Sequence, residues 1–252
     1  MCMAKVTVIT ATTGHPILPK CIESVAKQTH ADVQHLLIVD GRERSEIVTE
    51  QLTGLASDAD HSLGSMDQVH LPYSIGKDRW NGHRIYAAGT YMAKGQYVMY
   101  LDQDNYIDPT HIADCLKVIE SGNDWAYSLR KIVNKEGDYL CHDDCESLGK
   151  WPSILDPDDY FVDVNCYFLP IKLAVHASPI WFRKTREPGQ LEVDRALCRF
   201  LRQIAPKYDS TYGYTVNYTA GSSDNSVQKE FFITGNAAML KARDGILPWK
   251  NN

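Results

Sequence analysis

Short apolar runs alternate with amphipathic segments along the first half of the chain. The apolar runs are rich in β-branched residues and have the length of strands, so they predict buried strands at residues 5–10, 35–41, 66–71 and 96–101. The amphipathic segments predict helices at residues 17–28, 43–55, 79–93 and 109–120. Strands that alternate with helices favour parallel pairing through right-handed crossovers. The pattern therefore predicts an α/β fold with a mostly parallel central sheet.

The second half of the chain has a less regular pattern. It predicts strands at residues 125–133 and 162–170, a loop-rich stretch at 134–160, a helix at 189–204, a strand and turn at 212–221 and a terminal helix at 225–240. No repeat, low-complexity tract or clear linker divides the sequence. We therefore expect one domain over residues 1–252, composed of a regular half, 1–121, and an irregular half, 122–252.

Polar residues follow three of the predicted strands at the point where each strand ends. They are Thr10-Ala11-Thr12, Asp40 and Asp102-Gln103-Asp104. The carboxyl ends of parallel strands share one edge of an open α/β sheet, which is where such sheets bind ligands. We therefore expect these side chains to meet at one rim of the fold.

The D-x-D pair, Asp102 and Asp104, is a candidate metal site. Two carboxylates two residues apart at a strand end can contact one cation if the backbone turns there, and oxygen ligands suit Mg²⁺ or Mn²⁺. Such an ion neutralises the charge that develops on a diphosphate leaving group. The alternative is a turn with exposed acids before the next helix, but Asp108 and Pro109 already supply the start of that helix.

Composition and charge narrow the class of protein. The chain has 252 residues, 44% hydrophobic and 23% charged, and a net charge of -6, which argues against a nucleic-acid partner. Seven scattered cysteines favour reduced thiols, and Cys141 to Cys145 lacks a second pair of zinc ligands. The first residues do not resemble a signal peptide, and no apolar run reaches the ~20 residues that span a bilayer. We expect a cytoplasmic protein without a transmembrane segment; peripheral membrane contact and a homodimer stay open.

Four segments together resemble the family-2 glycosyltransferases, nucleotide-sugar-dependent enzymes of the GT-A fold. The segments are "VTVITATT", "ESVAKQTH", "HLLIVDG" and "AAGTYMAKGQYVMYLDQDN", in the family's order and spacing between residues 6 and 114. The resemblance implies a GT-A-like three-layer α/β/α sandwich with a Rossmann-like nucleotide-sugar-binding half, residues 1–121, and an acceptor-binding half, residues 122–252. It also implies inverting, metal-dependent sugar transfer from a nucleoside-diphosphate sugar, with a UDP-sugar as the expected donor.

The resemblance assigns roles to residues of the first half. Asp40 contacts the nucleobase, and Thr10, Ala11 and Thr12 line the nucleoside pocket. Asp102 lies near the ribose and the metal, Asp104 coordinates the metal, and Gln103 between them belongs to the nucleotide site. The family's usual Ala-Arg-Asn in the third helix is replaced by Ile85-Tyr86-Ala87. Arg84, the nearest arginine, is assigned to the nucleotide because a guanidinium pairs well with phosphate; the alternative is a surface arginine.

An inverting transfer needs a general base, which the family supplies at the start of a late helix. Asp194 is the candidate, with Glu192 second, although Val193 replaces the acid that usually precedes the aspartate. We expect the helix N-terminus to lower the pKa of Asp194; the alternative is that both acids only complement the helix dipole.

The second half also supplies candidates for binding the sugar and the acceptor. Asp163 and Asn165 are expected to reach sugar hydroxyls, while His142, Asp143 and Asp144 lie in a loop-rich stretch suited to the acceptor. The acceptor itself is left open among a saccharide, a lipid-linked sugar, a protein and a small molecule.

Three other functions compete with glycosyl transfer. A nucleotidyltransferase of similar fold would carry a glycine-rich phosphate loop after the first strand, where residues 10–20 hold one glycine and no arginine. A noncatalytic nucleotide- or sugar-binding protein of the GT-A fold would not need the intact Asp102 and Asp104 pair. A Rossmann dehydrogenase is disfavoured because no G-x-G-x-x-G follows the first strand.

Overall fold

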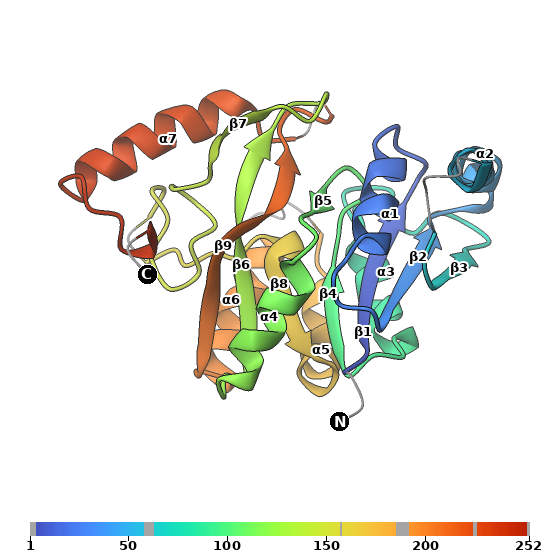
Figure 1. Ribbon diagram of the computed structural model, residues 1–252, viewed down its shortest axis with the longest axis horizontal. Helices are drawn as coiled ribbons and strands as arrows, with labels where there is room; N and C mark the ends of the chain where they lie inside the picture. The colour runs from blue at the N-terminus through green and yellow to red at the C-terminus, as the bar shows by residue number, and fades with distance from the viewer. Residues whose placement is uncertain (1–3, 58–62, 157, 185–191, 224–225, 251–252) are drawn as a thin grey trace.

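The protein folds around one mixed sheet, as the computed structural model shows (Figure 1). The structure describes residues 4–57, 63–156, 158–184, 192–223 and 226–250. Within these residues the strand order is β3-β2-β1-β4-β8-β6-β9-β5, and β7 pairs with β6. The strands are β1 Val6–Thr12, β2 Val33–Val39, β3 Met66–His70, β4 Tyr97–Tyr100, β5 Tyr106–Ile107, β6 Trp125–Val133, β7 Tyr139–His142, β8 Tyr167–Pro170 and β9 Tyr208–Thr219.

The helices follow the strands in alternation through the first half of the chain. The α-helices are α1 Leu18–Ala26, α2 Ser45–Ser57, α3 His83–Met92, α4 His111–Glu120, α5 Ile171–Ala177, α6 Val193–Ile204 and α7 Lys229–Ala242. Short 3₁₀ helices are η1 Arg42–Arg44, η2 Val164–Cys166, η3 Ser178–Trp181 and η4 Pro248–Lys250. No helix among the described residues has the length and apolar character needed to cross a membrane.

Strands β3, β2, β1 and β4 pair in parallel, and helices cover both of their faces. Leu37 and Val39 of β2 join a buried cluster with Leu18 of α1, whereas Ile38, between them, faces Gly89 of α3. Successive strand residues point to opposite faces, so α1 and α3 lie on opposite sides of the sheet. A Cβ at Gly89 would lie 2.8 Å from Cγ2 of Ile9, so glycine permits this close packing. The three-layer α/β/α arrangement predicted for the first half is confirmed.

The second half extends the same sheet with antiparallel pairs. β8 is antiparallel to β4 and β6, β7 is antiparallel to β6, and β9 runs parallel to β6 and antiparallel to β5. Figure 1 shows the long strands β6 and β9 side by side, with α7 to one side of their upper parts. The two halves of the sheet meet where β4 neighbours β8.

Several predicted boundaries shift in the structure. The third helix begins at His83 rather than at 79, and the predicted strand 162–170 is the turn η2 followed by β8. The turn forms because the Asp163 side chain accepts a hydrogen bond from the backbone N–H of Asn165, which competes with strand geometry. The loop-rich stretch contains β7, and β9 begins at Tyr208, four residues early. Residues 189–191 and 225, at the starts of the two late predicted helices, lie outside the described residues.

Candidate functional site

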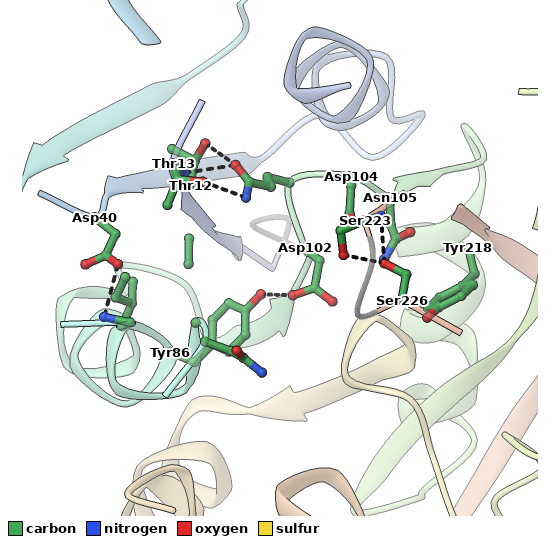
Figure 2. A pocket seen from close by; sticks show the side chains of 16 residues that line it. Thr12, Thr13, Asp40, Tyr86, Asp102, Asp104, Asn105, Tyr218, Ser223 and Ser226 are labelled. Carbon is green, nitrogen blue, oxygen red and sulfur yellow. Dashed lines mark hydrogen bonds between the residues drawn. The ribbon is translucent and has the colours of Figure 1, made fainter. Parts of the chain in front are cut away.

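A pocket of about 470 Å³ opens at the carboxyl ends of β1, β2 and β4 (Figure 2). Its wall includes Ala11, Thr12, Asp40, Asp102, Gln103 and Asp104. The three polar strand ends that the sequence analysis singled out therefore meet in one cavity. This is the edge at which parallel α/β sheets bind ligands.

Gln103 fastens the end of β1 to the loop after β4. Its Oε1 accepts hydrogen bonds from Thr12 Oγ1 at 2.7 Å, from the Thr13 N–H at 2.9 Å and from the His15 N–H at 3.1 Å. These bonds fix the shape of the pocket wall beside Asp102. Gln103 thus lines the predicted nucleotide site, and its amide oxygen accepts hydrogen bonds that connect the loop after β4 to the end of β1.

Asp40 shapes the opposite wall of the pocket. One carboxylate oxygen accepts a hydrogen bond from the Ile75 N–H at 2.7 Å, and the other accepts bonds from the Ser74 hydroxyl at 2.8 Å and the Gly76 N–H at 3.0 Å. A Cβ at Gly76 would lie 2.4 Å from the backbone oxygen of Asn81, so this loop requires glycine. Asp40 therefore lines the pocket while it anchors the loop from Ser74 to Gly76.

Asp102 and Asp104 lie on one loop in the middle of the pocket (Figure 2). Asp102 accepts hydrogen bonds from the Tyr86 hydroxyl and from Asn165 Nδ2, and Asp104 accepts one from the Ser222 hydroxyl at 2.6 Å. Burial and the nearby carboxylate of Asp104 raise the pKa of Asp102 to about 7. Two acids this close favour either a shared proton or a bound cation.

The donor set of this loop fits Mg²⁺ or Mn²⁺. Both ions prefer oxygen ligands, and Mg²⁺ sites often use one or two carboxylates together with substrate phosphates and water. Among the described residues no group of three or more His, Cys, Asp or Glu side chains could hold a metal by itself. Asp102 and Asp104 would therefore hold such an ion together with a phosphate-bearing ligand.

A smaller cavity of about 120 Å³ adjoins the pocket, with which it shares lining residues, and reaches the helix α6. Asp102, Tyr86 and Asp194 all line it, together with Trp181. Burial raises the pKa of Asp194 to about 7, so the prediction that the helix N-terminus lowers this pKa is wrong. The desolvation of a carboxylate inside the fold outweighs the helix dipole, which is a weak effect at a terminus. An acid with this pKa can accept a proton near neutral pH.

Some candidate residues lie away from the two cavities. Thr10 lies on β1 two residues before Thr12 and is buried. Its hydroxyl is hydrogen-bonded with His35 Nε2 at 3.0 Å. The Arg84 guanidinium lies 3.4 Å from the centre of the Trp80 ring and is absent from the lining of the pocket. Glu192 lines a separate surface pocket with Arg195. The assignments of Thr10 and Arg84 to the nucleotide, and of Glu192 to the base, are therefore not supported by their positions.

The polar residues predicted to reach the sugar and the acceptor make contacts within the protein. Asp163 pairs with the buried Arg130, and Asp143 pairs with the same arginine at 2.8 Å. Asp144 pairs with Lys250 at 2.5 Å, and the His142 ring stacks on Tyr214 with the ring centres 3.8 Å apart. The three acids therefore lie in ion pairs. The loop-like sequence pattern does not reveal these pairs, because their partners are far away in the sequence or come from another element.

Several pocket residues were missed by the sequence analysis. Tyr86 and Tyr218 line the pocket, as do Ser223 and Ser226 in the segment after β9. Ser223 and Ser226 could have been found by the pattern that identified Asp40 and Asp102, because they are also polar residues that follow the end of a strand. The two tyrosines had none, because an aromatic residue in a helix or strand is more often part of the core.

Comparison with known proteins agrees with this arrangement. The family described as "Glycosyl transferase family 2" matches residues 7–155, more than half of the chain. No curated protein sequence matches the chain.

Solved structures share the fold. The chain is similar to S. aureus TarS, with 14% identity and a TM-score of 0.61 over 98% of this chain and 44% of TarS, so it spans less than half of that protein. It is also similar to TarS 1–349 in complex with UDP-GlcNAc (15% identity, TM-score 0.63, 94% and 66% covered) and with UDP (14%, 0.62, 96% and 72%). At such identities the likeness concerns the fold, and it confirms the GT-A-like architecture predicted from the sequence.

Proposed function

The chain belongs to glycosyl transferase family 2, and from this premise we propose that it transfers a sugar from a UDP-sugar to the hydroxyl group of an acceptor. The first half, residues 1–121, binds the donor, and the second half, residues 122–252, supplies the base and the acceptor surface. The reaction inverts the configuration of the anomeric carbon and depends on Mn²⁺ or Mg²⁺. The UDP and UDP-GlcNAc complexes of the structural neighbours support UDP as the nucleotide and make UDP-GlcNAc the first donor to test.

One observation carries the proposal. Asp102, from the end of β4, and Asp194, from the first turn of α6, line the same cavity of about 120 Å³. That cavity shares Gly82, Tyr86 and Asp102 with the lining of the larger pocket, which also contains Asp104 and Asp40. A donor can therefore extend from Asp40 past the acidic pair and place its sugar beside Asp194.

The donor site is built from the strand ends. The nucleoside occupies the side lined by Ala11, Thr12 and Asp40, where Gly76 lets the loop pack closely against Asp40 and Asn81. The diphosphate lies against Asp102 and Asp104, which repel it unless a cation intervenes. A divalent cation held by the two carboxylates supplies that charge neutralisation when bound.

Asp194 acts as the general base. Its ionised carboxylate accepts the proton of the acceptor hydroxyl while the oxygen attacks the anomeric carbon from the side opposite the diphosphate. UDP leaves with the bonding electron pair, and the single displacement inverts the anomeric configuration. Its pKa of about 7 keeps a large fraction ionised at neutral pH while preserving enough basicity to take the proton.

The test combines ligand binding with turnover. UDP and UDP-GlcNAc are each expected to raise the Tm more strongly with Mn²⁺ than without it, because a ligand of the native state stabilises the fold. UDP release from UDP-GlcNAc and other UDP-sugars, with candidate hydroxyl acceptors, then measures transfer. Binding without turnover of any UDP-sugar would favour the noncatalytic alternative, and pyrophosphate release from a nucleoside triphosphate would favour a nucleotidyltransferase.

The metal assignment has its own variant. Asp104→Ala is expected to abolish Mn²⁺-dependent turnover and the Mn²⁺-dependent part of the Tm shift. Asp32→Ala is the matched control, because Asp32 is a partly exposed acid paired with Lys5 at 3.6 Å on the surface. Full activity of the Asp104→Ala protein would remove the cation from the mechanism.

A further inference from the structure

Asn165 joins the two halves of the protein directly behind the acidic loop. It lies in η2 and its side chain is fully buried. Its Oδ1 accepts a hydrogen bond from the backbone N–H of Asp102 at 2.6 Å. Its Nδ2 donates one hydrogen bond to Asp102 Oδ2 at 3.0 Å and another to Asp163 Oδ1 at 2.7 Å.

These three bonds require an amide at position 165. The group must accept from an N–H on one side and donate to two carboxylates on the other, and only a carboxamide does both in so small a volume. An aspartate at 165 would lose both donors and place a third carboxylate beside Asp102 and Asp163. An alanine would leave the buried N–H of Asp102 without its partner, which costs free energy.

The bonds also decide what the Asp102 carboxylate can do. One of its oxygens accepts from the Tyr86 hydroxyl and the other from Asn165. A carboxylate has about four lone-pair sites, so a single donor on each oxygen leaves capacity on both. Tyr86 and Asn165 thus fix the plane of the carboxylate without using up its capacity to bind a cation.

Asn165 is itself held by a buried charge cluster. Its partner Asp163 pairs with Arg130, whose side chain is 2% exposed. Arg130 also contacts Glu146 at 2.8 Å, and Glu146 contacts Arg195, the neighbour of Asp194, at 2.9 Å. One chain of ion pairs and hydrogen bonds therefore runs from the acidic loop of the first half to the helix that carries the base.

We propose that Asn165 is a positioning residue that orients the Asp102 carboxylate toward the divalent cation and the donor diphosphate, and that Arg130 holds Asn165 in place through Asp163. This inference rests on the proposed function, because it concerns the same cation. It adds a residue outside the lining of both cavities to the machinery of the site.

Mn²⁺ binding in the presence of UDP tests the proposal without turnover. Calorimetry or electron paramagnetic resonance is applied to the wild type, Asn165→Asp and Asn165→Ala. We expect both variants to bind Mn²⁺ about 10–100-fold more weakly, the usual effect of losing a hydrogen bond to a metal ligand. UDP affinity without Mn²⁺ should stay unchanged, and kcat should fall more than the KM for the acceptor rises.

Asn217→Ala is the matched control. Asn217 is also a buried asparagine, and its Nδ2 donates to the Tyr106 carbonyl at 3.2 Å and to Asp108 Oδ1 at 2.9 Å, on elements other than the acidic loop. This variant should lower the Tm but keep the Mn²⁺ affinity of the wild type. If Asn165→Ala does not fold, the nearly isosteric Asn165→Asp still reports on the cation.

The outcomes separate this proposal from the proposed function. Wild-type Mn²⁺ affinity in the folded Asn165 variants, with only a lower Tm, would reduce Asn165 to a structural residue and overturn the proposal. A loss of Mn²⁺ affinity in Asn217→Ala equal to that in the Asn165 variants would overturn it as well. Failure of the wild type to bind both UDP and Mn²⁺ would instead remove the proposed function and this inference with it.

Discussion

The two halves of the protein are stabilised in different ways. In the first half the interior combines aliphatic side chains with buried polar groups such as Thr7, Thr10 and Gln34, and the acids of the pocket lie at the ends of the strands. In the second half the interior contains Arg130 with three carboxylates, those of Asp143, Glu146 and Asp163. The first half therefore presents its acids on a binding rim, whereas the second half uses buried charge to fix where its functional groups lie.

The proposed function assigns most of the nucleotide binding to the first half and the general base to the second half. The groups expected to bind the nucleotide sit on the first half, where each follows a strand directly. The proposed base, Asp194, sits on α6, whose first turn is tied to the charge cluster through Arg195 and Glu146. Changes at the nucleotide end of the pocket should therefore act on UDP affinity, and changes at Asp194 should act on rate.

The largest expected effect is a loss of kcat without a loss of UDP affinity. Asp194→Asn should lower kcat by about 10²–10⁴-fold, the usual contribution of a general base, and leave the affinity for UDP unchanged. Steady-state kinetics and calorimetry of the same preparation measure both quantities. Normal turnover in this variant would place the base elsewhere, and a parallel loss of UDP affinity would contradict the division between the halves.

Removing the positive charge of Arg130 from the buried cluster should destabilise the fold. Arg130→Met leaves three buried carboxylates without their partner, which costs about 3–5 kcal/mol. Urea unfolding gives the free energy, and Lys117→Met, at an exposed pair with Asp114, is the control that should change little. An unfolding free energy equal to that of the wild type would show that the cluster contributes no stability.

The pH profile provides a test without a mutation. Asp194 must be ionised to accept a proton, and its pKa lies at about 7. The value of kcat should therefore rise about tenfold per pH unit below pH 6 and level off above pH 7 to 8. A profile that stays flat between pH 5 and 8 would mean that no group with this pKa limits the reaction.

The smallest expected effect concerns Arg84. Its guanidinium stacks on Trp80 outside the pocket lining, so Arg84→Ala should change the binding free energy of UDP by less than about 0.5 kcal/mol. The comparison is Asp40→Asn, which changes the pocket wall and should weaken UDP binding measurably. A large loss of UDP affinity in Arg84→Ala would restore the arginine to the nucleotide site.

Much of the first half could be predicted from the sequence because its determinants are local. The alternation of apolar strands and amphipathic helices fixed the order of elements from β1 to α4, and the polar strand ends predicted the rim with Asp40, Asp102 and Asp104. Thr10 lies two residues before the strand end, where its side chain is buried, so its position does not support the predicted place in the nucleoside pocket. Arg84 lies in the first turn of α3 with its guanidinium over Trp80, a contact that the sequence pattern does not reveal, and its assignment to the nucleotide stays a prediction.

The second half could be predicted less well because its determinants are far apart in the sequence. β8 lies between β4 and β6, a pairing that no local pattern encodes. Asp163 was assigned to the sugar and Asp143 to the acceptor because charged residues in irregular segments are usually exposed, and only the fold brings Arg130 between them. Asp194 was found through the family resemblance, while its raised pKa follows from burial that only the structure shows.

The anchoring of the 74–76 loop by Asp40 has a consequence for how this enzyme family member could change its donor. The Asp40 carboxylate accepts three hydrogen bonds from the loop and so fixes the pocket wall at the end where the proposed function places the nucleoside. Substitutions within the loop that keep those bonds would alter which base fits, while the acidic pair and Asp194 stay where they are. Donor selectivity can therefore evolve, or be engineered, separately from the reacting groups.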